Sequence, residues 1–275
     1  MIHPKRIFIT AFALLYISSS TLFSAGTVHD GKISTYLEGA FQEPSEVQSA
    51  LKNAGFKILA EQQLDKEGDL TTVVFTCPTL KNMANKTGKG FGAILRVLIN
   101  KADHEISITN PLYFAKAFLQ DSYDDTAANK VLTKLNNAFT NLKDSSDAMQ
   151  EGDLEGYHFM LGMPYYDDMT TVGEGKALLA KAKANKNTLF TLSLENGSTL
   201  IGYKINSETA KFAKKIGSKN ASLLPYTILI ENNKAKILAP KYYLALSYPS
   251  LSMSQFMTIA TVPGAIEKDC AKGLK

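Results

Sequence analysis

Hydrophobic positions in the first half of the chain follow two periods, one typical of helices and one typical of strands. Residues 44–54 have a helical period behind Pro44, and Gly55 is placed to end this helix. The apolar face of the predicted helix consists of Val47, Leu51 and Ala54. Partly alternating apolar runs predict strands at 33–41, 56–62 and 70–76.

A second, short helix is predicted just before Gly88, where a left-handed residue ends a helix at little cost. Its apolar stripe is Leu80, Met83, Ala84 and Thr87. Two strands at 93–100 and 105–109 then form a predicted hairpin that ends at Pro111. A longer helix follows the Asp124-Asp125 cap, with an apolar face of Ala128, Val131, Leu132, Leu135, Ala138, Phe139 and Leu142.

The same pattern returns in the second half, where residues 217–242 match residues 88–113 without a gap. Identical residues at this spacing are Ala84/Ala213, Lys86/Lys215, Gly88/Gly217, Leu95/Leu224, Ile99/Ile228, Pro111/Pro240 and Tyr113/Tyr242. The second copy predicts a helix that ends at Gly217, a hairpin of 223–230 with 235–238, and a helix at 253–260 that Pro263 ends or kinks. Leu154-Glu155-Gly156 echoes Leu37-Glu38-Gly39 and marks the front of this copy.

This order of elements predicts an α+β fold of two homologous repeats. We expect the repeats at 27–145 and 153–275, with a linker at 143–153 that is rich in Asp, Ser and Gly. Each repeat is expected to be a mainly antiparallel sheet with two or three helices packed on it. A repeat of this length is a domain, because solenoid units are about 20 to 50 residues long.

Residues 1–26 have the layout of a signal peptide: basic residues, an apolar run of about a dozen residues, and a small polar end. The run is shorter than the ~20 residues that cross a bilayer, so we expect cleavage after Ala25 or Gly26 rather than retention as an anchor. The mature chain is then periplasmic or secreted, without a transmembrane span.

The charge balance argues against nucleic acid as a partner. Without Lys5 and Arg6 the chain has 28 basic and 26 acidic residues, which is close to neutral. The lysine-rich stretches 176–186 and 211–219 alternate with alanine and are interpreted as solvated helix faces.

Several segments suggest chemistry, but each has a simpler structural interpretation. His158 and Met160 would suit copper or haem iron, whereas core packing of methionine is the simpler hypothesis. Gly88 to Gly92 lacks the Lys-Ser/Thr ending of a phosphate loop. The acidic pairs Asp124-Asp125 and Asp167-Asp168 are interpreted as helix caps. No metal or cofactor is expected.

Cys77 and Cys270 are the two cysteines of the chain. In an exported protein they suggest a disulfide, and two unpaired thiols or a reactive Cys77 are the alternatives.

The aligned segments resemble the prokaryotic domain of unknown function 302 family. The resemblance rests on residues 75–78, 110–115, 224–225 and 239–245, which lie at the strand ends and prolines of the family pattern. Arg96 stands where that pattern has proline. The resemblance implies a compact α+β domain that pairs with another copy, here within one chain, and it implies no reaction.

Matched aromatic residues are the remaining candidates for binding. Tyr113, Phe114, Tyr242 and Tyr243 follow the two prolines and would face each other under pseudo-twofold symmetry. They form either a packed interface or an apolar cleft for a small ligand. The sequence favours an exported, non-catalytic binding protein for a small apolar ligand or an envelope protein, and an internal pseudo-dimer as its state. The alternative is a periplasmic redox or metal-handling protein that uses Cys77 with Cys270, or His158 with Met160.

Overall fold

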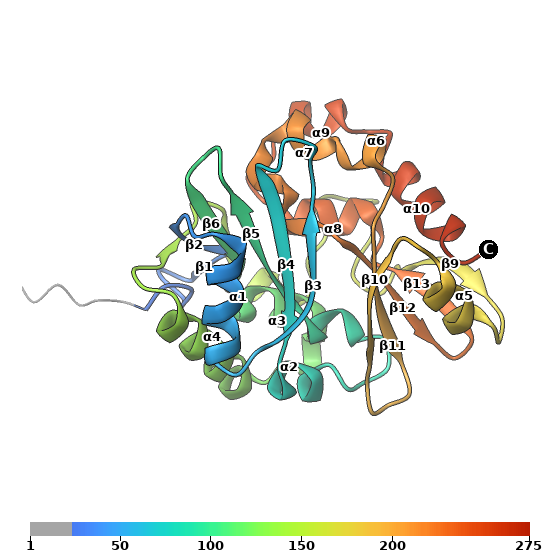
Figure 1. The fold of residues 1–275 in the computed structure, drawn as a ribbon, viewed down its shortest axis with the longest axis horizontal. Helices are drawn as coiled ribbons and strands as arrows, with labels where there is room; N and C mark the ends of the chain where they lie inside the picture. Colours follow the sequence, from blue (N-terminus) through green and yellow to red (C-terminus); the bar gives the residue numbers. More distant parts are fainter. Residues whose placement is uncertain (1–23) are drawn as a thin grey trace, which may run out of the picture.

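The computed structural model describes residues 24–275, which form a mixed α+β fold with antiparallel sheets (Figure 1). Residues 24–153 are called the N-terminal half and residues 154–275 the C-terminal half. Most of the expected signal peptide, residues 1–23, lies outside the described residues. Within the described part of the chain, no helix has the length and apolar character needed to cross a membrane.

The N-terminal half alternates strands and helices. Its strands are β1 (Lys32–Ser34), β2 (Tyr36–Ala40), β3 (Lys57–Gln63), β4 (Leu70–Thr76), β5 (Leu95–Asn100), β6 (Glu105–Thr109), β7 (Lys143–Asp144) and β8 (Ala148–Gln150). Its helices are α1 (Pro44–Asn53), α2 (Pro78–Met83), α3 (Pro111–Leu119), α4 (Asp125–Ala138) and the 3-10 turns η1 (Gly90–Ala93), η2 (Gln120–Ser122) and η3 (Glu151–Asp153). The strands and the two amphipathic helices α1 and α4 confirm the periodicity analysis.

The C-terminal half has a similar succession. Its strands are β9 (Thr170–Glu174), β10 (Thr188–Ser193), β11 (Thr199–Tyr203), β12 (Tyr226–Glu231) and β13 (Lys234–Ile237). Its helices are α5 (Leu178–Ala184), α6 (Ser207–Ala210), α7 (Phe212–Ile216), α8 (Pro240–Ser247), α9 (Met253–Thr258), α10 (Val262–Lys272) and the 3-10 turn η4 (Ser218–Leu223).

The two large sheets share the order of five strands, and the first sheet has β7 as a sixth. One sheet has the order β3-β4-β5-β6-β2-β7, and the other has β10-β11-β12-β13-β9. A third, two-stranded sheet joins β1 and β8. The end strands β3 and β10 lie side by side where the two sheets meet (Figure 1). All residues of β4 and β5 are buried, because α1 covers β4 from one side and η4 of the C-terminal half contacts both strands.

Two buried helices were missing from the sequence prediction. Pro111 and Pro240 end the hairpins as expected, but each also occupies the first turn of a helix, α3 or α8. Proline is compatible with that position because its missing N–H has no intrahelical partner there. Almost every side chain of α3 and α8 is buried, so these helices have no polar face that would give a helical period. The expectation of two or three helices per sheet was therefore too low.

Other boundaries also differ from the sequence prediction. Pro263 lies in the first turn of α10 and begins that helix instead of ending the previous one. The expected linker contains β7, which pairs with β2, and β8, which pairs with β1. Leu154-Glu155-Gly156 forms a turn, whereas Leu37-Glu38-Gly39 lies in β2; the strand that occupies the place of β2 in the second sheet is β9.

Candidate functional site

The contact between the halves is built from aromatic side chains on α3 and α8. The Tyr113 hydroxyl donates to the Leu246 carbonyl at 2.7 Å, and the Tyr242 hydroxyl donates to the Ala117 carbonyl at 3.5 Å. Tyr242 lies 129 positions after Tyr113, and Leu246 lies 129 positions after Ala117. Each half therefore donates one such hydrogen bond to the corresponding carbonyl of the other half. Such a reciprocal contact is typical of a twofold interface.

The four aromatic residues singled out from the sequence lie in this contact. Tyr113, Phe114, Tyr242 and Tyr243 are only 0–5% exposed. Their neighbours are other rings: Phe118 lies 5.8 Å from the ring centre of Tyr243, and Tyr113 lies 5.2 Å from that of Phe114. The four rings are buried and pack against other rings, which is the arrangement expected for a packed interface.

Arg96 is a buried cation at the same contact. Its guanidinium donates to the Tyr243 hydroxyl at 3.0 Å and to the Pro225 carbonyl at 2.9 Å. Pro225 is the residue 129 positions after Arg96, so the two matched positions touch each other. Burial raises the pKa of the Tyr243 hydroxyl, and the nearby guanidinium opposes that rise. Arg96 therefore ties the two halves together by hydrogen bonds to neutral oxygen atoms.

Two turns also reach across between the halves. The Gly88 N–H donates to both carboxylate oxygens of Glu231, at 3.0 and 3.1 Å. In the opposite direction, the Ser218 hydroxyl donates to the carboxylate of Asp103 at 2.9 Å. The loop at Gly88 thus binds a carboxylate of the protein itself. Gly88 has φ +76° as expected for its turn, although α2 already ends at Met83.

Open space between the halves lies where the β3–β4 turn faces α6 and α7. We call this space the turn–helix cleft; its volume is about 530 Å³. That size falls in the range of ~300–1,000 Å³ that is typical of small-ligand sites. The lining residues are Leu64, Asp65, Lys66, Glu67, Leu70, Ser207, Glu208, Ala210, Lys211, Ala213, Lys214, Lys215, Ala221 and Leu224.

Two ion pairs line the turn–helix cleft, and one of them joins the turn to α7. Lys214 of α7 bonds Glu67 of the turn at 3.1 Å, and Lys211 bonds Glu208 at 2.6 Å. The pKa of the Glu208 carboxyl is lowered by the hydrogen bond from Lys211. The pKa of the Glu67 carboxyl is lowered by its own backbone N–H and then by Lys214. Since Leu70, Ala213, Ala221 and Leu224 beneath these charges are buried, the cleft combines an apolar floor with a charged rim.

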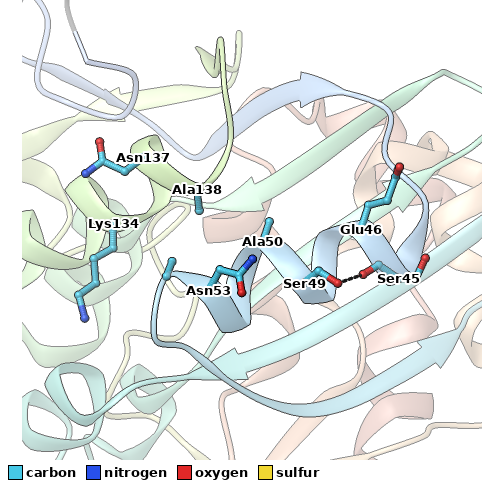
Figure 2. A pocket seen from close by; sticks show the side chains of 9 residues that line it. Ser45, Glu46, Ser49, Ala50, Asn53, Lys134, Asn137 and Ala138 are labelled. Atoms are coloured by element: carbon cyan, nitrogen blue, oxygen red, sulfur yellow. Dashed lines mark hydrogen bonds between the residues drawn. The ribbon is translucent and has the colours of Figure 1, made fainter.

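A second hollow, of about 760 Å³, lies between α1 and α4. Figure 2 shows that its lining side chains, Lys134 and Glu46 among them, project from the two helices. Ser49 donates to the Ser45 carbonyl of its own helix, and Glu46 is held by the capping box at Glu43. Because Ser49 and Glu46 are bonded within or next to their own helix, we consider this hollow a poorer candidate for a ligand than the turn–helix cleft.

The two cysteines are free and buried. Cys77 precedes α2, and Cys270 lies in α10, on the other side of the molecule in Figure 1. Of the alternatives left open by the sequence, the structure therefore has two unpaired thiols. Burial raises the pKa of the Cys270 thiol far above its usual value. A thiol that stays protonated is a poor nucleophile, so Cys270 is not suited to exchange chemistry.

His158 and Met160 lie in an irregular loop, and Met160 is not packed in the core as the simpler hypothesis expects. The His158 ring contacts the Tyr165 ring in a tilted arrangement with ring centres 4.4 Å apart, and Met160 is exposed. Among the described residues, no group of three or more His, Cys, Asp or Glu side chains is placed to bind a metal ion. The segment is therefore a surface loop.

That loop forms an exposed apolar surface with α9. Phe159 stacks on Phe256 with ring centres 5.8 Å apart, which brings the loop and the helix together. Exposed around this contact are Met160, Leu161, Tyr165, Met253 and Met257. Leu161 is 97% exposed. Exposed apolar patches of this kind mark interaction surfaces in soluble proteins.

The acidic pairs have different roles. The Asp124 carboxylate accepts from the Ala127 N–H at 2.9 Å and caps α4, which confirms the prediction. The prediction for Asp167-Asp168 was wrong, because these residues precede β9 and the Asp168 carboxylate accepts from the Tyr165 N–H within a turn.

Sequence reasoning missed the turn–helix cleft. Lys211, Lys214 and Lys215 were assigned to a solvated helix face, and they are indeed exposed. The sequence does contain one signal: Lys214 lies 129 positions after Asn85, so a short side chain in one copy is replaced by a long charged one. No family model, curated protein or solved structure matches this chain. The resemblance to the domain of unknown function 302 family stays a prediction.

Proposed function

We propose that this chain is an exported, non-catalytic binding protein that holds a small ligand in the turn–helix cleft. The observation that carries the proposal is the cleft itself, which opens between the halves with an apolar floor and a charged rim. Rigid walls favour binding, because a ligand then loses little affinity to reordering of the protein.

The proposal includes two copies of one domain that form an internal pseudo-dimer. The common strand order of the two large sheets supports this, as do the exchanged hydrogen bonds of Tyr113 and Tyr242. Gly68 and Gly197, also 129 positions apart, both adopt a positive φ in the turns after β3 and β10. Two features that share a spacing of 129 residues, together with the common strand order, favour duplication over coincidence.

Export to the periplasm or beyond the cell is proposed from residues 1–26 of the sequence. Contacts of Gly26 favour cleavage after Ala25. The Gly26 N–H donates to the Asp144 carboxylate at 2.6 Å, and its carbonyl accepts from Asn110 at 3.0 Å. Cleavage after Ala25 keeps both contacts and places a new ammonium on Asp144, whereas cleavage after Gly26 removes both.

The experiment is a native mass spectrum of the mature protein purified from its own compartment, compared with the denatured mass. The cleft-blocking variant is Ala210→Phe, which adds a ring to the cleft lining. Its matched control is Lys81→Phe, at the corresponding position of α2 in the N-terminal half. An organic mass retained by the wild type and K81F but absent from A210F supports the proposal. No retained mass, or a mass that A210F still holds, contradicts it.

A protein partner is the second candidate, favoured by the exposed apolar surface around Leu161. The test places a photocrosslinking amino acid at position 161 in living cells, with position 130 on the exposed side of α4 as the control. One defined crosslinked product from 161 and none from 130 would support an envelope partner. Equal or absent products at both positions would exclude this surface.

A further inference from the structure

We propose that the ligand of the turn–helix cleft is an amphipathic monoanion, a carboxylate on an unbranched acyl chain. This inference rests on the proposed function and adds the chemical class of the ligand. Its basis is the arrangement of charge and apolar area in the cleft lining.

The lining has one positive charge in excess. Lys66, Lys211, Lys214 and Lys215 face three carboxylates. Two of those carboxylates, Glu208 and Glu67, bond Lys211 and Lys214. The third, Asp65, accepts from the backbone N–H groups of Gly68 and Leu70 and so stabilises the turn.

Lys215 supplies the excess charge. Lys66 lies near Glu208 and contributes to lowering the pKa of its carboxyl. Lys215 is exposed and makes no hydrogen bond or ion pair within residues 24–275. A single anionic group would complete the charge balance at this end of the cleft. A dianion would leave one negative charge uncompensated beside Glu67 and Glu208, and a cation would add to the positive excess.

The apolar floor of the cleft indicates the chemistry of the part of the ligand that follows its anionic group. Its apolar side chains are Leu64, Leu70, Ala210, Ala213, Ala221 and Leu224. No hydroxyl or amide side chain lines this floor besides Ser207 at the start of α6, so a sugar or a peptide would find few hydrogen-bond partners there. Burial of an aliphatic chain needs no such partners and is favourable in proportion to its apolar area.

The experiment is isothermal titration calorimetry of the full mature chain with three probes of equal chain length: decanoate, decanol and decyltrimethylammonium. We expect decanoate to bind at least tenfold more tightly than decanol, and the ammonium compound to bind most weakly. Each methylene added between hexanoate and decanoate should tighten binding by up to about fourfold.

Charge-reversal variants test the role of Lys215. Lys215→Glu is expected to weaken decanoate at least tenfold and to leave decanol unchanged. The matched control is Lys86→Glu, because Lys86 occupies the corresponding exposed position after α2 in the N-terminal half. It should leave both affinities unchanged.

The outcomes separate the inference from the proposed function. If decanol binds as tightly as decanoate and A210F abolishes both, the cleft binds an apolar ligand and the anionic class is wrong. The inference is also overturned if K215E and K86E weaken decanoate equally, or if none of the probes binds. An organic mass found in the native spectrum would in that last case still support the cleft as a binding site.

Discussion

The molecule contains two corresponding junctions between its halves, and one is closed while the other is open. At the closed junction, the β10–β11 turn meets the residues after α2, and the Asn196 N–H donates to the Asn85 side chain at 2.7 Å. At the open junction, the β3–β4 turn meets α7, and Lys214 bonds Glu67 at 3.1 Å. The two pairs correspond to each other, because Lys214 lies 129 positions after Asn85 and Asn196 lies 129 positions after Glu67. A side chain-to-backbone bond draws the first turn close, whereas two long side chains hold the second turn away.

The residues beneath each pair reinforce the difference. At the closed junction, Leu194 and Leu229 pack against Gly90 of the other half. The corresponding residues at the open junction are Asp65 and Asn100, which are polar. Apolar contacts exclude water and close the gap. Asp65 and Asn100 make no such contact, because their side chains form hydrogen bonds with the Gly68 and Leu70 N–H groups and with Asp103 and Ser218. The comparison teaches that a few different residues at corresponding positions can decide whether a junction is closed or open, without a change of fold.

Raising the pH is the broadest way to break both junctions at once. Burial raises the pKa of Tyr113, Tyr166, Tyr226 and Tyr242 well above the ordinary value of 10.0. The unfolded chain ionises these groups near that pH, while the fold keeps them protonated. The stability they support is therefore complete below about pH 10 and falls by ~1.4 kcal/mol per tyrosine one pH unit higher.

The measurement is an alkaline titration followed by phenolate absorbance and far-ultraviolet circular dichroism. We expect the two signals from the buried tyrosines to change together in one cooperative step. Ionisation of these tyrosines well before helix is lost would contradict their burial at the contact.

Truncation of Phe118 should break the contact that both junctions share. The Phe118 ring lies 5.8 Å from the ring centres of both Tyr166 and Tyr243. Phe118→Ala is expected to lower the free energy of unfolding by about 3–5 kcal/mol, because it leaves a cavity in a packed interface. Ser247→Ala, at the corresponding position of α8, should change it by less than ~1.5 kcal/mol. Urea denaturation measures both, and equal effects would refute the importance of this ring.

A methyl group at Gly90 should strain the closed junction alone. A Cβ atom there would lie 2.5 Å from Leu229 Cδ1. Gly90→Ala is expected to cost about 1–3 kcal/mol of stability through overpacking. The matched change in the C-terminal half is Lys219→Ala, which creates no close contact of this kind. Its cost should come only from loss of the 3.6 Å ion pair with the buried Asp147 carboxylate. A neutral G90A variant would show that the closed junction tolerates separation.

Exchange of the open pair for the closed one should have the smallest effect on stability. In the double variant Lys214→Asn with Glu67→Asn, both residues are exposed, so the melting temperature should not change measurably. Shorter side chains allow the turn to approach α7, so decanoate binding should fall at least tenfold. Unchanged affinity would mean that this pair does not hold the cleft open.

Much of the fold was predictable where an element has a solvated face or is bounded by a polar turn. The helix at 44–54, the helix behind Asp124 and the two hairpins followed from hydrophobic period and turn residues. Helices α3 and α8 were not found, because a helix buried on all sides has no periodic polar face. Their prolines were interpreted only as the ends of strands, although proline suits both positions.

The site was less predictable than the fold. The matched tyrosines were located at the contact of the halves from their spacing alone, but whether rings pack or leave a gap depends on neighbours such as Phe118 that are distant in sequence from α8. The cleft depends on a difference between corresponding residues, Asn85 and Lys214, in two tertiary contacts. A single sequence gives no measure of the distance between a turn and a helix, so the cleft could not be predicted from the sequence.

The neighbouring positions of β3 and β10 bear on how this protein avoids aggregation. Each is the end strand of its sheet, and an unpaired strand edge is a template for association with another chain. Because β3 and β10 lie side by side, each half shields the edge of the other. We expect a half produced alone to expose this strand edge and to associate with copies of itself. Because both halves belong to one chain, the strand that shields each edge is always present.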